Sequence, residues 1–126
     1  MKSKKVIHAW GRYFAQLHQI SRKFSVDHPI IAKRIQTWRE IHHGVLKDIV
    51  LDKEDEEVVG NVDHWGVLHG DLNCSNFFYH REGDYLSVFD SDQTQQGFFL
   101  WDVAQACLSS VMLKEAGLPI SGTPVP

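Results

Sequence analysis

HGDLNCSN at residues 69–76 is the stretch that decides the fold of this chain, because short apolar segments flank it on both sides. Residues 65–68 (WGVL) read as a strand that leads into it. Residues 77–80 and 85–89 read as the outgoing and returning strands of a hairpin. Because a hairpin returns the chain to its starting point, Asp90 is expected to lie beside this loop.

Three oxygen-bearing side chains would meet there. Asn76 follows Asp71 by five positions, which is the spacing of the catalytic-loop pattern H-R-D-x-x-x-x-N. Asp90 and Asn76 offer the hard oxygen atoms that Mg²⁺ prefers, and the carboxylate of Asp71 can accept the proton of an attacking hydroxyl. Gly70 stands where the pattern has Arg, and glycine allows a positive φ or a close approach of the backbone. These residues predict phosphoryl-transfer chemistry.

Further motifs agree with a known family. WDVA at residues 101–104 and Gly97 follow the hairpin, and FAQLH at residues 14–18 lies far upstream. Together with HGDLNCSN and with VFD at residues 88–90, these motifs resemble those of the aminoglycoside phosphotransferase and choline kinase family, relatives of the protein kinases. The resemblance extends over residues 4–116.

The resemblance implies roles for single residues. Asp71 would be the catalytic base, and Asn76 and Asp90 would be the metal ligands. His69 and Asp102 would hold the loops in place, Asp102 through a structural hydrogen bond at the start of a helix. The cofactors would be Mg²⁺ and ATP, the phosphoryl donor, and the acceptor would be the hydroxyl of a small molecule.

Asp92 leaves two interpretations open, because it either assists Asp90 at the metal or faces solvent. Asp90-Ser91-Asp92 is also a D-x-D element, which favours, more weakly, a metal-dependent glycosyltransferase. That hypothesis leaves the pattern at residues 69–76 unexplained. The other alternative is a noncatalytic or truncated kinase-like remnant that acts in binding or regulation.

The expected fold is α+β: a mainly helical lobe, similar to the C-terminal lobe of a protein kinase, with a small β-hairpin that carries the catalytic and metal-binding loops. Apolar residues at helical spacing predict three helices, at residues 4–20, 29–51 and 100–116. The remaining polar segments predict a break or a loop, at residues 21–28, 52–63 and 91–97. The third helix is expected to turn its apolar residues inward: Val103, Ala104, Cys107, Leu108, Val111 and Met112.

A glycine-rich G-x-G-x-x-G or P-loop pattern does not occur in the sequence, and no residue is assigned to the nucleotide. We therefore expect that the N-terminal nucleotide lobe is absent, that residues 1–117 form a partial kinase-like C-terminal lobe, and that residues 118–126 form a mobile tail. Such a chain would be a fragment, a truncated gene product or a pseudoenzyme, inactive by itself. Apolar surface left bare by the missing lobe would favour a homo-oligomer or a missing-lobe partner.

Charge is divided unevenly along the chain, whose net charge is -3. Residues 1–50 carry ten Lys and Arg against three Asp and Glu, whereas residues 51–126 carry three against thirteen. An acidic site favours Mg²⁺ and a cationic, amine-bearing acceptor, and it excludes nucleic acid. Two cysteines are too few for a disulfide framework, and neither a secretory signal nor a membrane-spanning segment is recognisable. A cytoplasmic protein without a membrane partner is therefore expected.

Overall fold

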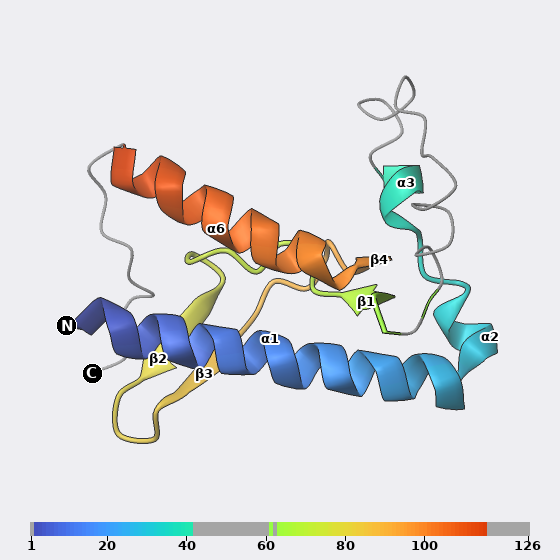
Figure 1. The fold of residues 1–126 in the computed structure, drawn as a ribbon, viewed down its shortest axis with the longest axis horizontal. Coiled ribbons are helices and arrows are strands. Elements are labelled where there is room, and N and C mark those ends of the chain that lie inside the picture. Colours follow the sequence, from blue (N-terminus) through green and yellow to red (C-terminus); the bar gives the residue numbers. More distant parts are fainter. Residues whose placement is uncertain (1, 42–60, 62, 116–126) are drawn as a thin grey trace.

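Two long helices enclose the strands in this computed structural model, which describes residues 2–41, 61 and 63–115 (Figure 1). Helix α1 (Lys2–Asp27) runs along one side, and helix α6 (Phe99–Glu115) crosses the other side. The remaining elements are the short helices α2 (Pro29–Ala32) and α3 (Trp38–Ile41) and the strands β1 (Trp65–Leu68), β2 (Phe77–His80), β3 (Tyr85–Val88) and β4 (Gln95–Phe98). The predicted α+β class is confirmed. The expected loop at 52–60, the helix segment at 42–51 and the tail at 118–126 lie outside the described residues.

Helix α1 is longer than expected, and the predicted break over residues 21–28 is wrong. Ser21 is buried on the packed face, where a Cβ built on Gly66 of β1 would lie 2.6 Å from the Ser21 Oγ. This close approach of β1 keeps a polar segment helical through long-range packing, which local sequence does not reveal. The helix ends before Pro29, because proline lacks an N–H and disfavours the helical conformation of the preceding residue.

The second predicted helix, residues 29–51, is interrupted in its described part. Helix α2 ends at Ala32, and the chain then forms a bridge between Thr37 and Gln96 of β4. Thr37 begins α3 with a capping box: its Oγ1 accepts from the Glu40 N–H at 3.3 Å, and the Glu40 carboxylate accepts from the Thr37 N–H at 2.6 Å. This T-x-x-E pattern could have been read from the sequence.

The strands form two separate antiparallel pairs. Strand β2 pairs with β3, with Phe77 opposite Val88, which confirms the predicted hairpin. Strand β1 pairs with β4, with Gly66 opposite Gly97. Residues 95–97 were expected in a loop, and that expectation is wrong. Strand β4 forms because β1 supplies a partner, although the sequence of β4, QQGF, has no β-branched residue.

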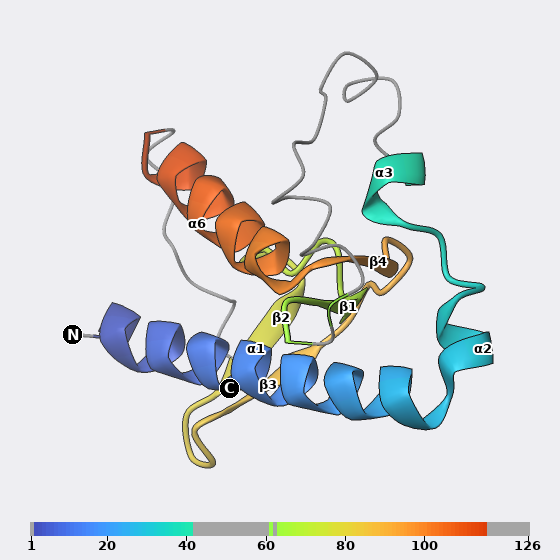
Figure 2. The same cartoon turned by 45° about the vertical axis from the view of Figure 1, so that its right-hand side comes forward.

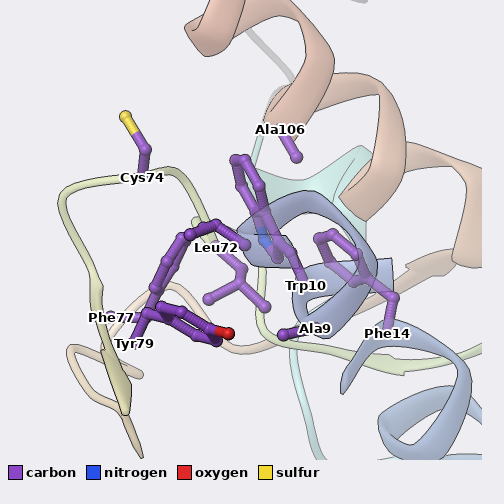
Figure 3. Close-up of a cluster of buried hydrophobic side chains, with 9 residues drawn as sticks. Ala9, Trp10, Phe14, Leu72, Cys74, Phe77, Tyr79 and Ala106 are labelled. Atoms are coloured by element: carbon purple, nitrogen blue, oxygen red, sulfur yellow. The ribbon is translucent and has the colours of Figure 1, made fainter. Parts of the chain in front are cut away.

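The main apolar core lies between α1, the hairpin and α6. Figure 3 shows Trp10 and Phe14 of α1 beside Leu72 and Phe77. The rings of Trp10 and Phe77 lie 5.0 Å apart. A second aromatic group joins α3, β4 and α6, since the ring of Trp38 packs edge-on against two neighbours, Phe98 and Trp101. The core therefore fixes the hairpin, and with it the ends of the site loops, against α1.

Helix α6 buries a different face from the one predicted. Among the side chains of the helix that the structure describes, Phe99, Asp102 and Ala106 are buried, whereas the larger aliphatic ones are exposed: Leu100, Val103, Leu108, Val111 and Met112. The expectation of an inward apolar stripe is therefore wrong for the residues listed here: Val103, Ala104, Cys107, Leu108, Val111 and Met112. Within the described part of the chain, no helix combines the length and apolar character needed to cross a bilayer.

Candidate active site

The backbone of the loop at residues 69–76 donates two hydrogen bonds to a single carboxylate. Asp102, fully buried in the first turn of α6, accepts hydrogen bonds from the N–H groups of His69 (3.3 Å) and Gly70 (2.9 Å). Gly70 has a φ of 83°, and a Cβ there would lie 2.0 Å from the carbonyl oxygen of Gln93. Only glycine fits this position, because any side chain would collide with the backbone of Gln93.

The same carboxylate is tied to α1. The Nε2 atom of His18 lies 3.1 Å from the Oδ2 atom of Asp102, and both side chains are buried. The His18 ring also stacks on Phe99 at a centroid distance of 4.6 Å. A buried charge needs such partners to offset its desolvation. The segment FAQLH, noted above without a role for its histidine, thus contributes the third hydrogen bond to Asp102.

His69 connects the loop to the end of β3. Its Nε2 lies 3.1 Å from the carbonyl oxygen of Phe89, and its Nδ1 lies 3.3 Å from the Asp71 nitrogen. Since a carbonyl can only accept and a backbone N–H can only donate, this pattern assigns the ring hydrogen to Nε2. His69 therefore holds both the residue before Asp90 and the backbone of Asp71.

Asp71 and Asn76 face each other directly. The amide nitrogen of Asn76 donates to the Asp71 carbonyl oxygen at 2.7 Å and to its Oδ2 at 3.1 Å. The Asn73 amide donates to the other carboxylate oxygen, Oδ1, at 2.9 Å. Because the Asn76 nitrogen is used in this way, its amide oxygen is the atom left to meet a cation. The Asp71 carboxylate is held in one orientation by two amides.

Asp90 reaches this group through the hairpin. The Phe89 N–H donates to the carbonyl oxygen of Asn76 at 3.1 Å, which places Asp90 next to the loop in a left-handed conformation, with φ of 61°. A hydrogen bond with Asp92 raises the pKa of Asp90, and the negative charges of Asp92 and Asp71 raise this pKa further. The structure thus brings Asp71, Asn76 and Asp90 together, with Asp92 at hydrogen-bonding distance from Asp90.

The donor set fits a hard divalent cation. Mg²⁺ takes oxygen ligands, keeps several waters and uses only one or two carboxylates. The neighbouring carboxylates that raise the pKa of Asp90 form a site where such a cation relieves like-charge repulsion. Among the described residues, no three His, Cys, Asp or Glu side chains are arranged as a metal site by themselves. The candidate donors are the carboxylate of Asp90 and the amide oxygen of Asn76, and only Asp90 belongs to those four residue types.

Two exposed aromatic rings beside the site were missed in the sequence. Phe78 and Phe89 are 39% and 40% exposed, and their ring centroids lie 5.0 Å apart. Phe78 comes two residues after Asn76, and Phe89 directly precedes Asp90. The signal was the alternation of β2, in which Phe77 points into the core and Phe78 points outward.

Comparisons with known proteins agree with this fold. The family model of the phosphotransferase enzyme family matches residues 2–119. A solved structure of the amicoumacin kinase hAmiN, in complex with AMP-PNP, Ca²⁺ and Ami, has the same fold, with a TM-score of 0.65 and 21% sequence identity. The match covers 86% of this chain and 35% of that kinase, so the chain spans about a third of the length of the kinase. No curated protein sequence matches the chain. The predicted kinase-like fold is confirmed, and the chain belongs to the phosphotransferase enzyme family.

Proposed function

We propose that this chain carries the catalytic loop of an ATP- and Mg²⁺-dependent phosphotransferase that transfers a phosphoryl group to a hydroxyl of a small, amine-bearing molecule. The observation that carries the proposal is the pair of hydrogen bonds that the Asn76 amide donates to Asp71, on a loop that the Phe89 N–H joins to the end of the hairpin before Asp90. A base and two oxygen ligands of this kind are what phosphoryl transfer requires of a protein.

Asp71 is the proposed base. Its carboxylate would accept the proton of the acceptor hydroxyl as the hydroxyl oxygen bonds to the terminal phosphorus of ATP and the bond from that phosphorus to the departing ADP breaks. The Asn73 and Asn76 amides hold the carboxylate in position. The negative charges of Asp71 and Asp92 both act on Asp90, and this concentration of negative charge favours a cationic acceptor. An amine on that acceptor is part of the proposal.

Asn76 and Asp90 are the proposed metal ligands, with Asp92 in support. When bound, Mg²⁺ would neutralise the negative charge of the phosphate oxygens. His69 and Asp102 are positioning residues: Asp102 fixes the loop backbone, and His69 joins Asp71 to the strand end before Asp90. The exposed ring pair Phe78 and Phe89 offers an apolar surface on which a nucleobase can stack next to the metal ligands.

This chain alone is expected to transfer phosphate poorly. The sequence has no glycine-rich phosphate loop, and the chain aligns with only 35% of a kinase of known structure. A noncatalytic remnant that binds or regulates is therefore the second candidate. The glycosyltransferase hypothesis gains no support, because the D-x-D element lies inside a phosphotransferase fold. A cytoplasmic location remains part of the proposal.

Isothermal titration of the purified chain with Mg²⁺ and AMP-PNP tests the proposal. We expect nucleotide binding that requires Mg²⁺ and that is lost in the Asp90→Asn variant. Asp63→Asn is the matched control, because Asp63 is an exposed carboxylate outside the site, and it should bind like the parent chain. Absent binding, or binding that is independent of Mg²⁺ and of Asp90, would contradict the proposal and favour the remnant.

A further inference from the structure

A glutamine lies buried behind the candidate site. Gln95 is 1% exposed and stands in β4 opposite Leu68, the residue of β1 that leads into the loop at residues 69–76. Strand β4 lies beside β1 in both views (Figures 1 and 2). The Gln95 Nε2 donates a hydrogen bond to the Gln93 carbonyl oxygen at 3.1 Å, whereas the Gln95 Oε1 has no hydrogen-bond partner in the described part of the chain. One half of a fully buried amide is therefore unpaired.

The unpaired oxygen is a consequence of this hydrogen bond. If the amide of Gln95 were turned over, its Oε1 would face the Gln93 carbonyl oxygen, and two acceptors would repel each other. Burying a polar atom without a partner costs free energy, and an apolar side chain of similar length, such as methionine, would avoid that cost. The stability of the chain therefore does not explain a glutamine at this position, and the hydrogen bond to Gln93 calls for another explanation.

The hydrogen bond holds Gln93 at the point where two loops meet. A Cβ built on Gly70 would lie 2.0 Å from the Gln93 carbonyl oxygen and 2.8 Å from the Gln95 Nε2. Gly70 directly precedes the proposed base, Asp71, and Gln93 follows the proposed metal ligand, Asp90, by three positions. The backbones of the loop with the base and of the loop with the metal ligand therefore touch at this carbonyl.

Other hydrogen bonds fix each loop by itself. The Gly70 N–H donates to the Asp102 carboxylate at 2.9 Å, which ties the first loop to α6. In the second loop, Thr94 donates to the Ser91 carbonyl oxygen through its N–H at 3.2 Å and through its Oγ1 at 2.7 Å. These hydrogen bonds do not act on the carbonyl that touches Gly70. The hydrogen bond from the Gln95 side chain does.

We propose that Gln95 is a positioning residue that sets the spacing of the two loops, and with it the separation of Asp71 from Asp90. It acts through the Gln93 carbonyl and touches neither substrate nor metal. Without its hydrogen bond, the carbonyl of Gln93, an exposed residue, can turn toward water, and the loops can move apart. The importance of this spacing for phosphoryl transfer rests on the proposed function, whereas the spacing itself does not.

A double-mutant cycle on the purified chain measures the spacing role without any ligand. Gly70→Ala forces a Cβ against the Gln93 carbonyl oxygen, and in Gln95→Met that oxygen can move aside. We expect Gly70→Ala to raise the unfolding equilibrium constant, measured in urea, at least about tenfold less in the Gln95→Met background than in the parent chain.

Gln96→Met is the matched control for this cycle. The Gln96 Nε2 also donates to a backbone carbonyl, that of Ile35 at 2.7 Å, but successive side chains of β4 point to opposite faces of the strand. Gly70→Ala should therefore cost as much in Gln96→Met as in the parent chain. Equal costs in the parent chain and in Gln95→Met, or the same relief in Gln96→Met, would overturn the proposal.

Amide NMR of Gln95→Met provides a second measurement, which needs no Gly70→Ala variant to fold. The signals of Asp90 and Asp92 should shift if the second loop has moved, whereas a purely local role would limit the shifts to the neighbours of Gln95 in β1 and β4. Unchanged signals at both aspartates would overturn the proposal.

Titration with Mg²⁺ and AMP-PNP connects the spacing to the site. Gln95→Met should bind the nucleotide about tenfold less tightly than the parent chain while its stability changes little, and Gln96→Met should bind like the parent chain. Equally tight binding by Gln95→Met would show that the site does not use this spacing. A chain that shows the coupling in urea but binds no nucleotide would contradict the proposed function and support the spacing role, whereas Mg²⁺-dependent binding without the coupling would refute the spacing role alone.

Discussion

Substitution of Asp102 by Asn tests the hydrogen bonds that hold the loop at residues 69–76 in place. Asp102 is fully buried and meets three donors: the His18 ring, the His69 N–H and the Gly70 N–H. Asparagine has nearly the same shape but replaces one carboxylate oxygen with an NH₂ group. In either orientation of the amide, at least one buried donor then faces another donor.

The expected loss is about 3 kcal/mol in the free energy of unfolding. A buried N–H without a partner costs about 1 to 3 kcal/mol, and hydrogen bonds to a charged group lose about 1 kcal/mol each when the acceptor becomes neutral. Relief from burying the carboxylate charge offsets part of this sum. Against a total stability of about 5 to 15 kcal/mol, such a loss is large but leaves the chain folded.

Urea denaturation measures the free energy of unfolding, and amide hydrogen exchange should show faster exchange at His69 and Gly70. Burial and the negative charge of Asp102 raise the pKa of Tyr13, so the variant should also lower this pKa, which an ultraviolet titration of tyrosine follows. Asp63→Asn, an exposed carboxylate substitution, is the control. An Asp102→Asn variant with unchanged stability and unchanged exchange at both amides would refute the role assigned to this carboxylate.

Two further perturbations act on residues of the candidate site. Gly70→Ala should destabilise the chain by about 3 kcal/mol or more, because its Cβ would meet the Gln93 carbonyl oxygen at a positive φ. Gly11→Ala is the control: nothing lies within 4 Å of its Cβ, and it should stabilise α1 by about 0.5 to 1 kcal/mol. Equal effects of the two substitutions on the free energy of unfolding in urea would contradict this prediction. Asp92→Asn should lower the pKa of Asp90, which carboxyl NMR titration measures. Since the raised pKa makes folding more favourable when Asp90 is protonated, stability in the parent chain is lost as pH rises through that pKa; the variant should be the more stable form at neutral pH, with no difference in acid. An unchanged pKa of Asp90 would show that the two carboxyls do not interact.

Local patterns predicted the parts of the fold that local forces determine. The short apolar segment at residues 77–80 and the turn after it predicted the hairpin, and helical periodicity predicted α1 as far as Ile20. The continuation through Ser21 depends on Gly66, 45 positions away in sequence, and periodicity contains no information about such a contact. Strand β4 was missed for the same reason, because only its pairing with β1 makes it a strand.

The candidate site shows the same difference between contacts that are local in sequence and contacts that are not. Asp71 and Asn76 lie on one loop, so their spacing alone predicted that they face each other, as the hydrogen bonds between them show. Asp90 was placed correctly beside them because a hairpin of known length leads to it. The contact of Asp102 with the Gly70 N–H spans 32 positions, and the contact with His18 spans 84. The sequence supplied the residue types for this network, and its connections required the structure.

The orientation of α6 shows why apolar content alone did not predict its buried face. Rotating the helix to bury Leu108 and Val111 would expose Phe99, so the buried apolar area would change little, while the three donors to Asp102 would lose their acceptor. The polar contacts therefore decide the rotation of the helix.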